Sequence, residues 1–257
     1  MLQEIQFEKY NKKGADYHYK QINKFNFKNF NISVLARYQK HVNLVVNYLK
    51  NNLKNNNEIK ILDIGCGDGV LLYLINKKIK KNNIKLYGVD LSEMALEVAR
   101  KKLQNGFFIK TDVYNLKFED SFFDIVISSD VIEHVNYPDK MLEEIKRVCK
   151  KNAFVAISTP IKYTKKPLDK MHFQEFFQED FFNLMEKYFI NCNLIESHNL
   201  LFKLFYEKIF KFGKYKLPIY KYIINIINIL TRINLFKKER KNDNELFSYM
   251  YVTGKNN

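Results

Sequence analysis

A glycine-rich segment that begins at Ile61 is the first candidate for chemistry in this sequence. It reads Ile-Leu-Asp-Ile-Gly-Cys-Gly-Asp-Gly, an apolar run containing Asp63 that passes into a turn with Gly65, Gly67 and Gly69. Glycine adopts tight backbone conformations without Cβ clashes, so a ligand can approach the main chain closely where the apolar run ends. The segment therefore predicts a ligand site at the end of a buried strand.

An acidic residue, Asp90, ends the next apolar run in the sequence Val-Asp-Leu. Its carboxylate can accept hydrogen bonds from both hydroxyls of a ribose. A dinucleotide site would favour the spacing GxGxxG, whereas the third glycine here comes one residue earlier. Asp68 also places a negative charge in the turn, which would repel a pyrophosphate but not a cationic sulfonium. These features predict a nucleoside-bearing cofactor and argue against NAD.

The order of motifs across residues 59–160 resembles that of the class I S-adenosylmethionine-dependent methyltransferases. ILDIGCGDG, GVDLS, a Thr-Asp pair and FDIVISSDVIEHV follow one another as in that family. The resemblance implies a Rossmann-like fold, S-adenosylmethionine as cofactor and S-adenosylhomocysteine as product. It also implies roles for single residues: the methionine portion is contacted by Asp63, Gly65, Gly67, Gly69 and Ser129, the ribose by Asp90 beside Leu91, and the adenine by Asp112 and Val113.

Two histidines are candidates for catalysis. Transfer of a methyl group to a hydroxyl is an in-line displacement that is helped by a base with a pKa near neutrality, and histidine suits this task. His172 comes first because it lies in the loop region after the fifth expected strand, where ligands bind in open α/β sheets. His134, in the sequence Glu-His-Val, is the second candidate. The alternative for His172 is that it only orders its loop.

A metal site is a separate alternative. The spacing of Asp130, Glu133 and His134 resembles the metal-binding stretch of ubiquinone-pathway O-methyltransferases and of small-RNA terminal 2′-O-methyltransferases. Such a set could hold Mg²⁺ or Mn²⁺ and polarise the acceptor. However, Glu-His-Val is common in relatives that use no metal, and Asp130 stands where the metal-using pattern has Glu. We therefore expect a reaction without a metal.

These residues must be positioned by an α/β core. From residue 59 to residue 158, short apolar runs alternate with stretches of helical periodicity, which predicts a parallel sheet with crossover helices. With the resemblance, we expect a Rossmann-like, seven-stranded, mostly parallel sheet with flanking helices. We divide the chain into an N-terminal helical segment over the cofactor site (1–58), a methyltransferase core (59–199), a basic, apolar helical insertion (200–246), and a last core strand with a tail (247–257).

The net charge of +15 is unevenly distributed. The segments 1–58 and 200–246 carry +6 and +7, whereas residues 59–199 carry only +1. The flanks could meet an anionic substrate, a polyanion or an acidic membrane surface, or could simply be solvated. In the insertion, Lys221, Asn225, Asn228 and Arg232 form one narrow polar stripe on an otherwise apolar helix. We expect burial of this helix against the core or a second subunit, as in a homodimer, with shallow membrane insertion as the alternative.

The cysteines and the apolar runs bear on location. The three cysteines form no CxxC pair, and no uninterrupted apolar run approaches the roughly 18 residues of a membrane span. We expect a cytoplasmic protein without disulfides, in one alternative peripheral to the inner face of the membrane.

Three acceptor classes remain open. The first is a sugar or other small polar molecule, anionic or nucleotide-linked, as in bacterial surface-polysaccharide biosynthesis, since lysines crowd the loop before His172 at positions 162, 165, 166 and 170. The second is RNA, suggested by the basic flanks and 15% aromatic residues. The third is a quinone precursor, O-methylated at the membrane surface.

Overall fold

The predicted seven-stranded sheet is confirmed in the computed structural model, which describes residues 10, 12–52, 58–79, 83–164, 167, 169, 171–212, 215–238 and 245–257. The strand order is β3-β2-β1-β4-β5-β9-β6. Neighbouring strands are parallel except that β9 runs antiparallel to both β5 and β6. The strands are β1 (Ile59–Ile64), β2 (Ile84–Asp90), β3 (Gly106–Lys110), β4 (Phe123–Ser129), β5 (Cys149–Pro160), β6 (Ile190–Asn199) and β9 (Phe247–Lys255).

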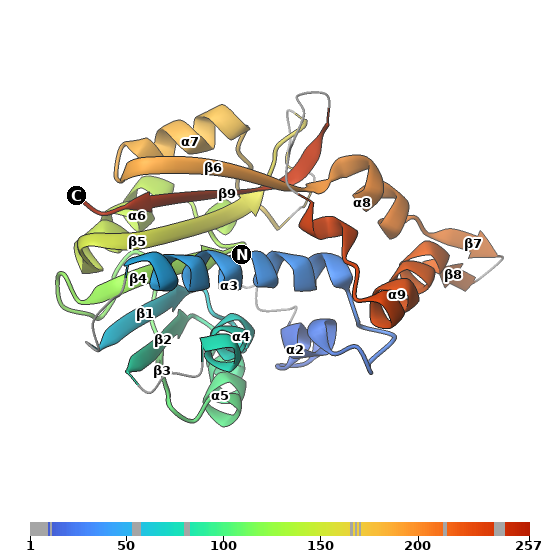
Figure 1. Ribbon diagram of the computed structural model, residues 1–257, viewed down its shortest axis with the longest axis horizontal. Helices are drawn as coiled ribbons and strands as arrows, with labels where there is room; N and C mark the ends of the chain where they lie inside the picture. The colour runs from blue at the N-terminus through green and yellow to red at the C-terminus, as the bar shows by residue number, and fades with distance from the viewer. Residues whose placement is uncertain are drawn as a thin grey trace.

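Helices cover both faces of the sheet (Figure 1). Alternate strand residues point to opposite faces, so Ile125 and Ile127 of β4 pack with one set of helices and Val126 with the other. The first set is α3 (Ile32–Asn52), α4 (Val70–Ile79) and α5 (Glu93–Lys102), and the second is α6 (Pro138–Val148) and α7 (Gln178–Glu186). This three-layer arrangement fixes the carboxyl ends of the parallel strands at one edge.

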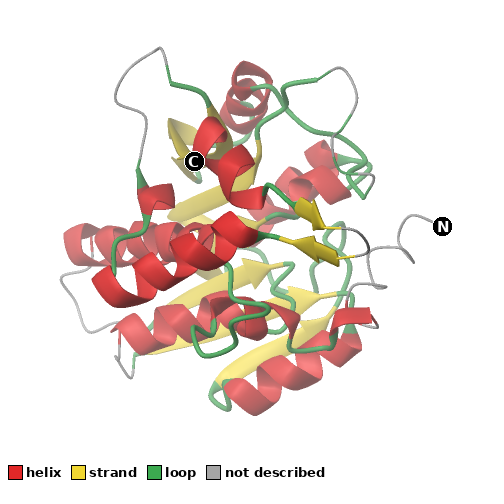
Figure 2. Ribbon diagram, turned by 90° about the vertical axis from the view of Figure 1, so that its right-hand side faces the viewer, coloured by secondary structure: helices red, strands yellow, loops and turns green. Residues whose placement is uncertain are grey.

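The segment between β6 and β9, predicted as a helical insertion, also contains two short strands. It forms α8 (Leu200–Glu207), a hairpin of β7 (Phe210–Phe212) and β8 (Tyr215–Leu217), α9 (Ile219–Thr231) and a short turn of 3-10 helix, η2 (Leu235–Lys237). These elements lie beyond the carboxyl edge of the sheet and stand in front of it in Figure 2. The hairpin was not predicted, because three-residue strands are too short to show an alternating pattern.

The orientation of α9 agrees only in part with the expected burial of this helix against the core or a second subunit, because Ile224 and Ile229 pack on a buried cluster while other apolar residues are exposed. Asn225, from the predicted polar stripe, is the fully buried residue of this helix. Its side-chain amide donates to the Phe30 carbonyl (2.9 Å) and its oxygen accepts from the Tyr206 hydroxyl (2.9 Å). Ile227 and Leu230 are instead 49% and 78% exposed. The polar side of the helix satisfies buried backbone groups of its neighbours, which turns apolar residues outward.

Candidate functional site

A cavity of about 950 Å³ lies at the carboxyl ends of β1, β2, β4 and β5. It falls at the upper end of the range of ligand pockets, which leaves room for a cofactor and an acceptor together. The predicted cofactor residues that line it are Asp63, Gly65, Asp90, Leu91, Asp112, Val113 and Ser129. Both predicted catalytic residues, His134 and His172, line the same cavity. The structure thus brings the two halves of the predicted site together.

The glycine turn combines a ligand-facing position with positions that serve the backbone. Gly65 has a φ of 70°, and a Cβ there would lie 2.2 Å from Cγ2 of Val131. Gly67 and Gly69 also have positive φ but are not among the residues that line the cavity. A Cβ on Gly69 would meet Ala99 of α5 at 2.8 Å. We therefore restrict the predicted ligand contact to Gly65 and assign the other two glycines to the shape and packing of the turn.

Asp90 holds this turn and still has acceptor capacity. Its Oδ2 accepts a hydrogen bond from the Gly67 amide (2.9 Å) and its Oδ1 accepts one from the Ser92 amide (2.8 Å). Each carboxylate oxygen has two lone pairs, so a further bond to each remains available for the two hydroxyls of a ribose. The residues fit the predicted nucleoside, and Asp90 links the ligand site to the backbone of the glycine turn.

Asp63 and Asp112 occupy different environments along the cavity. Asp63 is 2% exposed, and its burial, with the nearby charge of Asp90, raises its pKa well above the ordinary value. A cation bound beside Asp63 would lower this pKa again and favour the ionised carboxylate. S-adenosylmethionine carries such a positive charge on its sulfonium. Asp112 is held by the Tyr114 amide, which donates to its Oδ1 at 3.0 Å. The two carboxylates thus line different parts of the cavity: Asp63 lies near the end of β1, and Asp112 follows β3.

The environment of Asp68 corrects one step of the sequence argument. Its side chain is fully buried and is not among the residues that line the cavity. Its Oδ2 accepts from the amides of His18 (2.9 Å) and Tyr19 (3.2 Å), at the start of α2 (Tyr17–Ile22). Asp68 therefore anchors the N-terminal segment over the glycine turn, a role that the charge argument from the sequence did not include.

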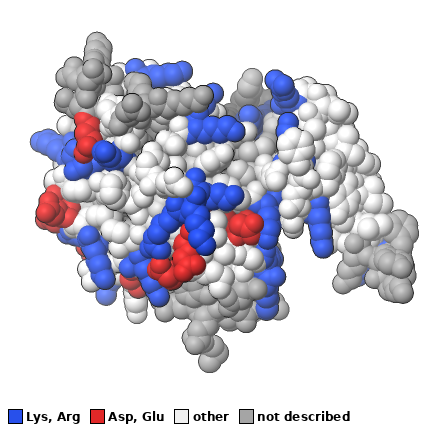
Figure 3. Space-filling model, turned by 90° about the horizontal axis from the view of Figure 1, so that it is seen from below, with Lys and Arg blue, Asp and Glu red and all other residues white. Residues whose placement is uncertain are grey.

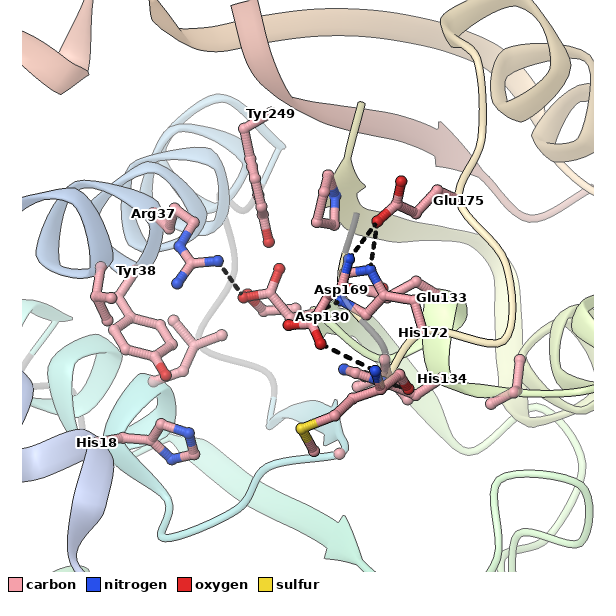
Figure 4. Close-up of a pocket in the computed structure, with 18 of the residues that line it drawn as sticks. His18, Arg37, Tyr38, Asp130, Glu133, His134, Asp169, His172, Glu175 and Tyr249 are labelled. Atoms are coloured by element: carbon pink, nitrogen blue, oxygen red, sulfur yellow. Dashed lines mark hydrogen bonds and ion pairs between the residues drawn. The ribbon is translucent and has the colours of Figure 1, made fainter. Parts of the chain in front are cut away.

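Arg37 and Asp130 form an ion pair across the centre of the cavity. The Arg37 guanidinium donates to Asp130 Oδ2 at 2.7 Å, and it lies 5.0 Å from the ring centre of Tyr249. Figure 4 shows this pair between Tyr38 on one side and the two histidines on the other. Asp130 has a φ of 58°, in the left-handed region. Such a conformation costs about 1 kcal/mol or more outside glycine, and the ion pair helps to hold it.

His172 is oriented by a buried carboxylate. Its Nδ1 lies 2.7 Å from Oε1 of Glu175, which is 6% exposed. The amide of the next residue, Phe173, donates to the Glu133 carbonyl at 2.9 Å, so the loop is docked on the 3-10 turn η1 (Ile132–His134). With Nδ1–H donated to Glu175, Nε2 of His172 is the nitrogen that can take a proton.

His134 stands beside His172, with the two ring centres 4.9 Å apart. Its Nδ1 lies 2.9 Å from the Met171 carbonyl, which fixes the ring against the loop that carries His172. Both rings are visible on the right of Figure 4, with Glu175 above them. Nδ1 of His172 therefore has a carboxylate as its partner, whereas Nδ1 of His134 has a backbone carbonyl.

The arrangement of possible metal ligands differs from the predicted set. Donor atoms of Glu133, His134 and His172 lie within 4.8 Å of one another, whereas Asp130 is engaged by Arg37. Glu133 is fully buried, with Oε2 accepting from Thr159 (3.1 Å) and Oε1 without a hydrogen-bond partner among the described residues. One oxygen and two imidazoles suit a transition metal better than Mg²⁺.

Two functional features were missed by the sequence argument. The Arg37–Asp130 pair joins residues 93 positions apart, and no local pattern indicates such a contact. Glu175 was visible as the fourth residue of His-Phe-Gln-Glu, but the spacing alone does not show that its side chain turns back to His172. Of the loop lysines, Lys162 lies over the ring of Phe177, and positions 165, 166 and 170 lie outside the described residues.

Comparison with known proteins gives the family of the chain. Residues 55–201, more than half of the chain, match the family model described as a methyltransferase domain. A ubiquinone/menaquinone biosynthesis C-methyltransferase of Campylobacter jejuni is 33% identical over 112 residues, covering 42% of this chain and 46% of the relative. A ubiquinone biosynthesis O-methyltransferase of Pasteurella multocida is 30% identical over 114 residues, covering 39% and 46%. The chain spans about half the length of the curated relatives it matches.

Solved structures extend the likeness to the fold. A methyltransferase of Thermotoga maritima, described as a possible histamine N-methyltransferase, aligns with a TM-score of 0.54 at 19% identity over 86% of this chain and 91% of that one. A phosphoethanolamine N-methyltransferase of Haemonchus contortus, solved with S-adenosylmethionine, aligns with a TM-score of 0.55 at 17% identity over 91% and 57%. The family match shows that the chain belongs to the methyltransferase-domain family, and it has the Rossmann-like fold of the class I S-adenosylmethionine-dependent methyltransferases.

Proposed function

We propose that the enzyme methylates a hydroxyl of a neutral acceptor that has an apolar part, of the kind represented by quinone precursors. The observation that carries this proposal is the His172–Glu175 pair, whose nitrogen and oxygen lie 2.7 Å apart in the cavity that contains the cofactor residues. When bound, S-adenosylmethionine supplies an electrophilic methyl group on a sulfonium. His172 Nε2 takes the proton of the acceptor hydroxyl as its oxygen attacks, and Glu175 stabilises the resulting imidazolium.

The charges of the cavity wall support a neutral acceptor. Arg37 and Lys203 are the lysine or arginine side chains among its described lining residues, and Arg37 is paired with Asp130. Asp169, Glu175 and Glu207 add acidic groups to the acceptor half. An anionic or nucleotide-linked acceptor would meet few free cations among the lining residues that the structure describes, so these residues give little support to the first acceptor class. The apolar and aromatic lining residues near the histidines and α8 are Met171, Phe173, Leu200, Leu204 and Tyr249.

The relatives point in the same direction. The relatives from Campylobacter jejuni and Pasteurella multocida are named as methyltransferases of ubiquinone or menaquinone biosynthesis. One is a C-methyltransferase and the other an O-methyltransferase, so their names do not decide the acceptor atom. We infer a hydroxyl oxygen because the oriented base can take the proton that a hydroxyl loses when its oxygen is methylated. A carbon acceptor also loses a proton, so the position of the methyl group in the product decides between the two.

A methyl-transfer screen tests the proposal. Purified enzyme and S-adenosylmethionine with a radiolabelled methyl group are incubated with polyprenylated phenols, nucleotide-linked sugars, unmodified sugars and tRNA. We expect label in the phenols, as an O-methyl group by nuclear magnetic resonance. Label only in sugars would transfer the assignment to polysaccharide chemistry, and salt-sensitive label in tRNA would transfer it to RNA. Either result would overturn the proposed acceptor while leaving the methyltransferase assignment intact.

A further inference from the structure

The end of the molecule formed by α8, the β7–β8 hairpin, α9 and η2, which we call the apolar end, exposes large hydrophobic side chains. On α9, Ile223, Ile226, Ile227 and Leu230 follow the spacing i, i+3, i+4, i+7 and are 42–78% exposed. That spacing places them on one side of the helix. On α8, Leu201 is 72% exposed. Single exposed apolar residues are common on protein surfaces. A continuous row of them along one face of a helix indicates an interaction site.

The outward direction of this face is fixed by the polar contacts beneath it. The Tyr206 hydroxyl accepts from the Ile32 amide (3.2 Å) and donates to Asn225 Oδ1 (2.9 Å). Asn225 in turn donates to the Phe30 carbonyl at 2.9 Å. Rotating α9 to bury its isoleucines would remove these partners and leave buried polar groups without hydrogen bonds, which is unfavourable. The exposed face is therefore the stable arrangement of this chain.

The border of the apolar end is basic. Within residues 200–212 and 215–238, Glu207 is the single acidic residue against eight lysines and arginines. Figure 3 shows an uncharged surface over this end, on the right, with blue groups along its border and no red group on it in that view. Beside α9 lies a hollow of about 380 Å³ lined by Lys12, Lys13, Lys28 and Lys221, with no acidic side chain among its described lining residues.

We propose that the apolar end docks on the surface of an anionic phospholipid bilayer, with the α9 face in the acyl boundary and the lysines of the hollow on lipid phosphates. Apolar insertion together with cationic attraction is the pattern of interfacial helices. A second copy fits less well, because pairing the same patch would bring two segments of +7 against each other. No helix among the described residues is long and apolar enough to cross a membrane, and the 13 residues of α9 span only about 20 Å.

Docking would also place the opening of the candidate-site cavity next to the lipid surface. Leu200, Lys203, Leu204 and Glu207 of α8 line the cavity, while Leu201 on the same helix points outward. An acceptor dissolved in the bilayer would then enter along α8. This access route rests on the proposed acceptor, whereas the docking itself does not.

Vesicle binding tests the docking without turnover. The full chain is sedimented with vesicles of phosphatidylcholine, or of phosphatidylcholine and phosphatidylglycerol in equal parts. We expect binding to the anionic vesicles, weakened as salt shortens the range of charge attraction. The double variant Leu201→Gln/Leu230→Gln and the double variant Lys28→Glu/Lys221→Glu should each reduce binding at least about tenfold. Met94→Gln, at an exposed residue of α5, and Lys77→Glu, at an exposed residue of α4, are the matched controls and should bind as the parent does.

Affinity for S-adenosylhomocysteine checks that each variant is folded, since none of these substitutions touches the cofactor residues. Loss of vesicle binding with unchanged cofactor affinity supports the docking, whatever acceptor is found. Equal vesicle binding by parent and double variants, or absence of binding to anionic vesicles, would overturn it. Concentration-dependent dimerisation that only Leu201→Gln/Leu230→Gln abolishes would assign the face to a second copy and would also overturn it.

Discussion

Nδ1 of His172 lies 2.7 Å from Oε1 of the buried Glu175, while Nε2 of the same ring is 4.0 Å from Oδ2 of the exposed Asp169. The buried carboxylate thus fixes the ring, and the second nitrogen remains on the side of the cavity. This arrangement resembles the general use of a carboxylate to orient a catalytic imidazole.

Replacing His172 with Asn should lower kcat by about 10²–10⁴-fold, the range for loss of a general base. The affinity for S-adenosylhomocysteine should stay the same, because His172 is not one of the residues predicted to bind the cofactor. Glu175→Gln retains a side-chain hydrogen-bonding group but removes the charge, so we expect a smaller loss of kcat together with a changed pH profile. Calorimetric titration and single-turnover rates measure both quantities. Full activity of His172→Asn would remove the base assignment and return the residue to a role in ordering its loop.

Replacing Asp90 with Asn should weaken cofactor binding by about 1.5–3 kcal/mol, the cost of losing a charged hydrogen-bond acceptor. The substitution would remove the charged acceptor for the ribose, and it would also weaken the hydrogen bonds that Asp90 accepts from the amides of Gly67 and Ser92 in the turn. Comparing calorimetric affinity with the free energy of unfolding separates ligand loss from damage to the turn. Asp120→Asn, with a side chain 76% exposed, is the control. Unchanged affinity in Asp90→Asn would show that the ribose assignment is wrong.

The sequence predicted the cofactor half of the site more fully than the acceptor half, for a physical reason. The cofactor residues lie in short segments at the ends of successive strands, so strand periodicity alone brings Asp63, Asp90 and Asp112 to one edge. The acceptor half depends on contacts between distant segments. The Arg37–Asp130 pair joins α3 to the end of β4, and no local spacing predicts it.

The burial of the helix faces in the insertion also depends on contacts between distant segments. Its helical periodicity was visible, but the direction of each face was not. Asn225 is buried because Phe30 and Tyr206 supply partners, and both lie far from it in the sequence. A polar stripe read from periodicity alone would be placed in solvent. The tertiary partners of Asn225 reverse that assignment.

Gly65→Ala should abolish measurable cofactor binding, because the new Cβ would lie 2.2 Å from Val131 Cγ2 at a position with φ of 70°. Adding Val131→Ala removes that atom, so the double variant should recover part of the affinity and leave the cost of the left-handed conformation, about 1 kcal/mol. Calorimetry on the four members of this cycle measures the coupling. Absence of recovery in a folded double variant would show that the clash with Val131 is not the cause.

Dialysis against EDTA should leave methyl transfer intact, as expected from the sequence. The donors of Glu133, His134 and His172 are close enough to hold an ion, but Glu175 already binds His172 Nδ1 and the set offers Mg²⁺ a single carboxylate. The assay compares initial rates before dialysis, after dialysis and after addition of Mn²⁺ or Mg²⁺. Loss of activity that Mn²⁺ restores would instead make these three residues a metal site. A matched dialysis without chelator controls for inactivation by handling.

Two buried histidines should lower the free energy of unfolding as the pH drops below about 6.5. Burial lowers the pKa of His41 and of His198 to about 3. In the unfolded chain these groups bind a proton near pH 6.5, so acid favours unfolding down to about pH 3, by roughly 2 kcal/mol per histidine between pH 7.5 and pH 5. Asp63 and Glu133, whose pKa values burial raises, contribute with the opposite sign.

Variants isolate the contribution of each histidine. Nε2 of His41 is hydrogen-bonded to the Ser158 hydroxyl, and Nε2 of His198 to the Ser33 carbonyl. The side-chain amide of glutamine can replace both of these bonds, whereas the bond between Nδ1 of His198 and the Ser197 hydroxyl would be lost. Urea unfolding of His41→Gln at pH 7.5 and pH 5 should show a pH dependence reduced by about 2 kcal/mol relative to the parent, and the double variant His41→Gln/His198→Gln by about twice that. An unchanged dependence would mean that these histidines keep an ordinary pKa in the folded protein, and that the acid sensitivity has its source in other groups.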